Sequence, residues 1–203
     1  MSDQLELDSD LQALGGATAA AAERYIETVR QVASGATPDA AIPLLLLATS
    51  DLTAAGARLG AIVDVVPASR FEPDDGPDPD VEPLRLSLVN LLEGIDDYHE
   101  VSDPLVSGEV SEGSLSNDLT DIAQALLVGL NHQRAGNLSE ALWWWQFSYL
   151  SDWGERAAAA TRVLLGLISH LRLDVDPDVA GEAKFEALHA ADDAAGTVDP
   201  SRG

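Results

Sequence analysis

Cysteine is absent from the 203-residue chain, and basic residues are scarce beside acidic ones. Without a thiol the chain forms no disulfide and holds no zinc–thiolate or iron–sulfur site. Eleven lysines and arginines, of which only Lys184 is a lysine, stand against 35 aspartates and glutamates, so the formal net charge is −24. Such a chain repels nucleic-acid phosphates and anionic membrane surfaces, which argues against direct binding to either.

Long apolar runs and several catalytic motifs are missing as well. The longest apolar stretch, 40–48, contains Pro43 and is far shorter than the ~20 residues of a membrane span. The acidic N-terminus lacks the basic and apolar regions of a signal peptide, so we expect a cytoplasmic protein. No glycine-rich nucleotide loop or G-x-S-x-G motif is present. We therefore expect no cofactor and no assigned catalytic residue, and a non-enzymatic protein is favoured.

Alanine and leucine dominate the chain, whereas β-branched and aromatic residues are few, a composition that favours helices. Apolar residues recur at helical spacing in five stretches, about 17–34, 38–64, 82–95, 113–134 and 139–173. Strand-like alternation is not evident anywhere. The sequence therefore predicts an all-α fold, a mostly antiparallel bundle of about five main helices. Pro43 either moves the start of the second helix to about residue 42 or kinks that helix.

Composition divides the chain into one domain with tails. Residues 1–16 end in a Gly-Gly pair and are expected to form a loose arm or a short helix. We expect 17–173 to be a single helical-bundle domain. An acidic linker interrupts it at 67–83, where five prolines and six acids occur. The tail 174–203 is expected to be partly helical, with a marginal helix at 178–192, or disordered.

Three segments of the second half carry a family resemblance. They are Asp97-Tyr98-His99-Glu100-Val101-Ser102-Asp103-Pro104, Ser114-Leu115-Ser116-Asn117-Asp118-Leu119-Thr120-Asp121-Ile122, and Glu140-Ala141-Leu142-Trp143-Trp144-Trp145-Gln146-Phe147-Ser148-Tyr149 with Asp152-Trp153-Gly154. The chain resembles DUF5063, a bacterial family of unknown function, in its actinobacterial form. The resemblance extends over roughly 18–172 and is most specific over 96–162. It implies no reaction.

Two positions depart from the pattern of this family. Gln146 stands where the resemblance implies an arginine, and Asp152 stands where it implies a histidine before Trp-Gly. A role of the family's polar side chains at these two positions is therefore in doubt for this chain.

All four tryptophans lie in one stretch of the chain, with Phe147 and Tyr149 among them. Because one helix cannot direct all these rings into one core, some of them must meet another element, a partner chain or a ligand. Three interpretations stay open: packing between helices, a homodimer seam, and a small-molecule pocket.

Polar residues beside this stretch suggest a ligand or interface site. A break between the third and fourth predicted helices holds the candidates Tyr98, His99, Glu100 and Asp103. In a regular helix, one face carries the candidates Trp145, Tyr149, Asp152 and Arg156, with Trp153 beside them. Asp152 and Arg156 form either a surface ion pair or an arginine held ready for an anionic ligand.

Asp118 and Asp121 are the weak candidates for a metal site, since hard cations prefer carboxylate oxygens. Acids are also expected in the first turn of a helix, where they interact favourably with the helix dipole. No metal-binding motif accompanies the pair, so no metal site is predicted.

We interpret the chain as a non-catalytic interaction or adaptor protein that self-associates through its tryptophan-bearing helix, or binds a protein partner. One alternative is a small-molecule or enzymatic site where the 96–104 break meets the 145–156 helix face. Another is mimicry, in which an acidic bundle occupies the nucleic-acid-binding surface of a basic partner.

Overall fold

The computed structural model describes residues 2–67, 79–101 and 108–173. These residues are mainly helical. In chain order the elements are α1 (Ser2–Ala33), the 3₁₀ turn η1 (Pro38–Ala40), α2 (Ala41–Gly60), α3 (Glu82–Leu91), β1 (Asp97–Val101), β2 (Val110–Ser114), α4 (Leu115–Arg134), α5 (Leu138–Ser148), the π-helical turn η2 (Tyr149–Trp153) and α6 (Gly154–Leu173). The expected helix at 178–192 and most of the expected linker lie outside the described residues.

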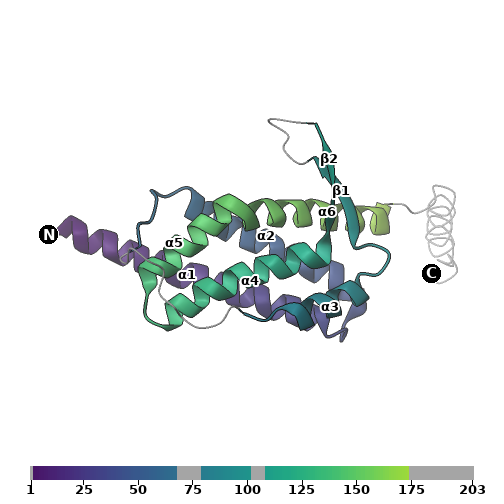
Figure 1. The fold of residues 1–203 in the computed structure, drawn as a ribbon, viewed down its shortest axis with the longest axis horizontal. Coiled ribbons are helices and arrows are strands. Elements are labelled where there is room, and N and C mark those ends of the chain that lie inside the picture. The colour runs from purple at the N-terminus through teal and green to yellow at the C-terminus, as the bar shows by residue number, and fades with distance from the viewer. Residues whose placement is uncertain (1, 68–78, 102–107, 174–203) are drawn as a thin grey trace, which may run out of the picture. The chain divides into compact units, whose positions relative to one another are not determined.

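The chain divides into two compact units, Met1–Leu165 and Gly166–Gly203. In the first unit, α1 packs against α2 and α4, and α4 packs against α5 (Figure 1). The predicted apolar stripe of α4 is confirmed, since its leucines and isoleucine are buried: Leu119, Ile122, Leu126 and Leu130. Across the core, the Tyr25 hydroxyl donates a 3.0 Å hydrogen bond to the Leu119 carbonyl. The second unit is described only over 166–173, the end of α6.

Helix α1 begins at Ser2, well before the expected start at Ala17, and it runs through the Gly15-Gly16 pair. A close contact explains why residue 15 is a glycine. A Cβ atom on Gly15 would lie 2.5 Å from Cδ1 of Leu138, at the start of α5. Gly15 therefore allows the two helices to approach, and does not end α1.

Helix α2 begins at Ala41, after the η1 turn, which agrees with the predicted displacement of its start by Pro43. At the third helical position the missing N–H of Pro43 has no partner within the helix to lose. The segment Pro38–Gly60 is long and apolar enough, by length and composition alone, to cross a membrane. Leu45, Leu52 and Leu59 are buried on it, and α2 packs against α1 and α5, as the core helix of a bundle does.

The β-hairpin contradicts the prediction of a purely helical fold. Strands β1 and β2 pair antiparallel, from Asp97 opposite Ser114 to Val101 opposite Val110. Tyr98 is the buried residue of β1, and its ring lies across Gly113 of β2, where any Cβ would overlap it. The hairpin leads directly into α4, whose predicted start is confirmed by Ser114: its hydroxyl accepts a 3.3 Å hydrogen bond from the Asn117 N–H.

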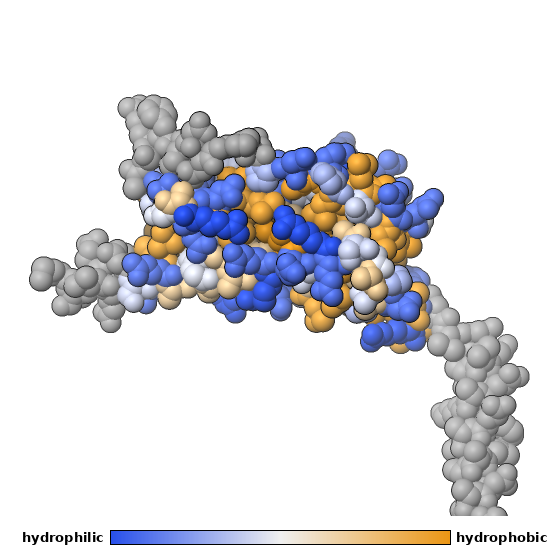
Figure 2. Space-filling model, turned by 90° about the horizontal axis from the view of Figure 1, so that it is seen from below, coloured by the Kyte–Doolittle hydropathy of each residue, from blue (hydrophilic) through white to orange (hydrophobic). Residues whose placement is uncertain are grey.

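The predicted last helix is likewise interrupted, because η2 separates α5 from α6. Part of the molecular surface is of mixed character. The face seen in Figure 2 has hydrophobic residues exposed between hydrophilic ones. Despite the large net charge, apolar side chains are therefore exposed and available for contacts.

Candidate functional site

Three side chains from three elements meet between the hairpin and the helices. Tyr98 of β1 donates a 2.5 Å hydrogen bond from its hydroxyl to Oδ2 of Asp118 on α4. The other carboxylate oxygen of Asp118 accepts a 3.0 Å bond from Nη1 of Arg156 on α6. Nε of Arg156 also donates a 2.8 Å bond to Asp152. The predicted proximity of Tyr98 and Arg156 is thus present, but Asp118 fills the space between them.

Burial controls the protonation of this cluster. It raises the pKa of the Asp118 carboxyl above its ordinary value, although the hydrogen bonds from Tyr98 and Arg156 act in the opposite direction. Burial and the bond to Asp118 together raise the pKa of the Tyr98 hydroxyl, which therefore stays protonated as a donor. Burial alone would lower the pKa of Arg156, but Asp152 and the other carboxylates raise it. Arg156 remains a cation.

The weak metal candidates Asp118 and Asp121 lie on either side of the Arg156 guanidinium. Nη1 of Arg156 lies 3.0 Å from an Asp118 oxygen and 3.3 Å from an Asp121 oxygen. Arg85 of α3 contributes a second contact, 2.8 Å from Asp121. A guanidinium thus occupies the position between the two carboxylates that a metal ion would need. Among the described residues no group of three or more metal-ligating side chains is found.

The remaining candidates are divided among different surroundings. Trp145 is fully buried against α4, where its Nε1 donates a 3.2 Å bond to the Leu126 carbonyl. Tyr149 packs over Gly56 of α2, and Trp153 is buried beside it, with ring centroids 4.8 Å apart. The π turn breaks the regular helical face on which these residues were predicted. Trp145 and Tyr149 therefore belong to the core contacts of α4 and α2, while Arg156 faces Asp118.

His99 and Glu100 do not join the Tyr98–Asp118–Arg156 cluster by a hydrogen bond. His99 is exposed and Glu100 is half-buried on β1, and both line a groove together with α6. Asp103 lies outside the described residues.

The tryptophan stretch has one buried side and one exposed side. On the exposed side, Trp143 and Phe147 stack with ring centroids 5.6 Å apart and planes 13° from parallel. Phe147 is 53% exposed and Leu150 is 62% exposed. We call Trp143, Phe147 and Leu150 the α5 face. Of the three interpretations of this stretch, core packing accounts for Trp145 and Trp153 but not for the α5 face.

Gln146 has a definite structural task that its sequence position did not reveal. Its Nε2 donates a 2.9 Å bond to the Leu59 carbonyl, and its Oε1 accepts a 2.7 Å bond from the Val65 N–H. The side chain therefore fastens the segment after α2 to α5. An amide serves here as both donor and acceptor, which an arginine could not do.

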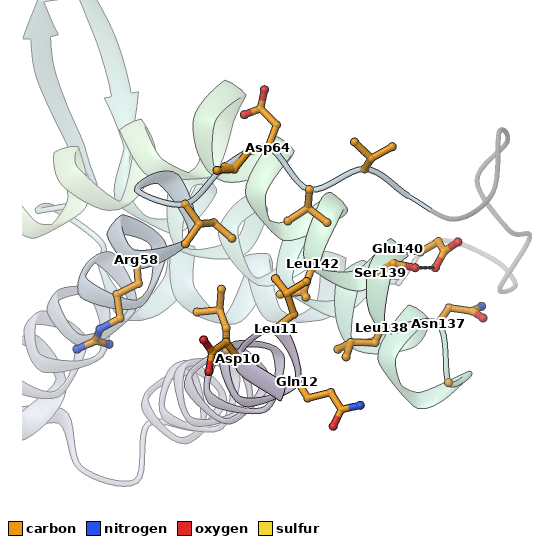
Figure 3. A pocket seen from close by; sticks show the side chains of 16 residues that line it. Asp10, Leu11, Gln12, Arg58, Asp64, Asn137, Leu138, Ser139, Glu140 and Leu142 are labelled. Carbon is orange, nitrogen blue, oxygen red and sulfur yellow. Dashed lines mark hydrogen bonds between the residues drawn. The ribbon is translucent and has the colours of Figure 1, made fainter. Parts of the chain in front are cut away.

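An apolar groove of about 1100 Å³ lies beside the segment that the Gln146 hydrogen bonds hold against α5 (Figure 3). Figure 3 shows Leu11 of α1 and Leu138 and Leu142 of α5 directed toward one another across it. Ile62, Val63, Val65 and Val66 border the groove from the segment after α2. The sequence alone does not reveal this groove, because its walls come from three parts of the chain that are far apart in sequence.

The comparisons with known proteins agree with this architecture. A model of the family described as "Domain of unknown function (DUF5063)" matches residues 10–170. The chain belongs to the DUF5063 family. The crystal structure of protein BF1032 from Bacteroides fragilis, a structural genomics target, is similar to this DUF5063 protein with a TM-score of 0.59. The two are 17% identical, over 74% of this chain and 89% of that chain. That likeness concerns the fold alone. No curated protein matches the chain.

Proposed function

We propose that this DUF5063 protein is a non-catalytic interaction protein that self-associates through the α5 face. The observation that supports the proposal is the stacked pair of Trp143 and Phe147, which stands beside the exposed Leu150. Aromatic side chains are enriched at the energetic centres of protein interfaces. Contiguous exposed apolar surface on a soluble chain typically marks a place of contact.

Charge favours a second copy of the chain as the partner. Residues 141–151 include no charged side chain, although the whole chain carries a net charge of −24. In a twofold contact the same patch of both copies meets itself, so an acid near the centre of the seam would lie close to an acid of the other copy. A surface that binds a basic partner would instead be expected to carry acidic side chains. The uncharged α5 face therefore suits another molecule of the same chain better than a basic partner.

The apolar surface continues beyond α5. Val63 and Val66 are exposed and border the groove of Figure 3, and the Gln146 hydrogen bonds hold their segment beside α5. Leu150 also lies against the end of α2, with Cδ2 3.4 Å from a Cβ position on Gly60. A second copy would cover the α5 face and these valines together.

Substitutions on the α5 face test the proposal without disturbing the core. We expect wild-type protein to associate with rising concentration in sedimentation equilibrium, and the Phe147→Asp and Leu150→Asp variants to remain monomeric. Leu47→Asp is the matched control, because Leu47 on α2 is 62% exposed, as Leu150 is. The control should associate like wild type. A wild-type protein that stays monomeric, or a control that fails as the test variants do, would contradict the proposal.

A further inference from the structure

A groove of about 610 Å³ separates the β-hairpin from the first turns of α6. The hairpin contributes His99, Glu100, Val101 and Val110, and α6 contributes Glu155, Ala158, Ala159 and Arg162. None of these residues belongs to the α5 face. An activity of this groove would therefore be independent of self-association.

The α6 wall presents opposite charges at its two ends. Glu155, Ala158 or Ala159, and Arg162 recur at intervals of three and four residues, so they share one face of the helix. Arg162 forms no ion pair within 4 Å with another described residue. Arg156, by contrast, is surrounded by Asp118, Asp121 and Asp152. Arg162 is thus the cation that the groove offers to a ligand.

Glu100 faces this wall from β1. Its carboxyl group is half-buried, and burial raises its pKa, as do the charges of Asp118 and Glu155, whereas Arg162 lowers it. Like Arg162, Glu100 forms no ion pair within 4 Å among the described residues. The groove therefore combines a carboxylate pole at Glu100 and Glu155, a guanidinium pole at Arg162, and apolar walls between them.

We propose that this groove binds a free α-amino acid with an apolar side chain. The ligand carboxylate pairs with the Arg162 guanidinium, whose planar donors match a carboxylate. The ligand ammonium pairs with Glu100, and Glu155 adds to the negative field there. The apolar side chain lies over Ala158 and Ala159 on the α6 wall. A plain cation would be repelled by Arg162, and a plain anion by the two glutamates, so the zwitterion fits best.

The test uses L-leucine and two half-ligands, followed by amide chemical shifts of the full chain. The half-ligands are 4-methylpentanoate, which lacks the amine, and 3-methylbutylamine, which lacks the carboxylate. We expect leucine to shift the amides of β1 and of residues 155–162. Each half-ligand should bind about tenfold more weakly or worse, since one charge-assisted contact is lost.

Two variants and a control localise the effect. Arg162→Gln and Glu100→Gln should each weaken leucine binding by about tenfold or more, with unchanged far-UV circular dichroism. Arg58→Gln is the control: Arg58 is an exposed arginine on α2 without an ion pair among the described residues, and its variant should bind leucine like wild type. The proposal is overturned if leucine leaves the groove amides unshifted, if the half-ligands bind as well as leucine, or if the control loses as much affinity as the test variants.

Discussion

The indole of Trp145 lies directly on the backbone of Gly129, so that a methyl group at that position would overlap the ring. This contact brings α5 onto α4, and the hydrogen bond from Trp145 to Leu126 secures it. The neighbouring side chain, Trp144, likewise donates a 2.8 Å bond to the Ala125 carbonyl. Two of the four tryptophans are thus bonded to the backbone of α4, and α5 is held with its opposite face outward.

Substitution of Gly129 tests this contact. Gly129→Ala should lower the free energy of unfolding by about 1–3 kcal/mol, because the added methyl group forces Trp145 or the helices to shift. Chemical denaturation measures the effect. Gly16→Ala is the control within a helix: nothing lies near its Cβ position. That substitution should raise the stability by roughly 0.5–1 kcal/mol. Equal effects at both glycines would contradict the packing.

Arg156 stabilises the buried carboxylate of Asp118. The Asp118 side chain is only 7% exposed, and its remaining partner is Tyr98. Arg156→Met should therefore cost about 1–3 kcal/mol of stability, below the value for a fully buried pair because Arg156 is partly solvated. Adding Asp118→Asn should recover part of this loss, since no buried charge is then left without its cation. Losses that simply add in the double variant would show that the two side chains do not act together.

The raised pKa of Asp118 also predicts a pH dependence. A carboxyl group with a higher pKa in the folded state binds its proton more tightly there, so its contribution is full below the unfolded pKa and is lost as pH rises through the folded value. The stability of wild type relative to Asp118→Asn should therefore fall as pH rises from about 4 to about 7. Urea denaturation of both proteins across this range measures it. A difference that grows with pH would have the wrong sign.

Gln146 should control the segment that follows α2. Gln146→Leu leaves the Leu59 carbonyl and the Val65 N–H without their partner, which should cost about 1–3 kcal/mol. It should also speed hydrogen exchange at the Val65 amide more than at amides of α4. Gln31→Leu, at an exposed position of α1, should stay within about 0.5 kcal/mol of wild type. Unchanged exchange at Val65 would contradict the fastening role.

The sequence was sufficient for those elements that local signals define. The stripe of α4, its start at Ser114 and the effect of Pro43 all follow from spacing and backbone chemistry. The resemblance likewise predicted the family that the chain belongs to. The helical features of α2 and α4, in contrast to the family resemblance, depend on residues within a few positions of one another.

The remaining features depend on contacts between distant residues. The hairpin strands are short and polar, and Tyr98 is buried only because it meets Gly113 and Asp118. The Gly15-Gly16 pair predicts the end of an N-terminal arm, whereas Gly15 lies inside α1, in close contact with Leu138. The π turn begins at Tyr149, whose ring packs over Gly56 of α2. The spacing of apolar residues along the sequence does not predict this contact. In the candidate site, the ion pair of Asp152 and Arg156 was predictable from its spacing, whereas the insertion of Asp118 was not.

Self-association through the α5 face is the central claim, and its dependence on salt is the most direct test. Two chains of net charge −24 repel one another, and raising the salt from about 0.1 M to about 1 M shortens the screening length from roughly 10 Å to roughly 3 Å. Sedimentation equilibrium should therefore show wild-type association that strengthens with salt, and a Phe147→Asp variant that is monomeric throughout. A wild-type protein that is monomeric at both salt concentrations, or an association that weakens as salt rises, would contradict the claim.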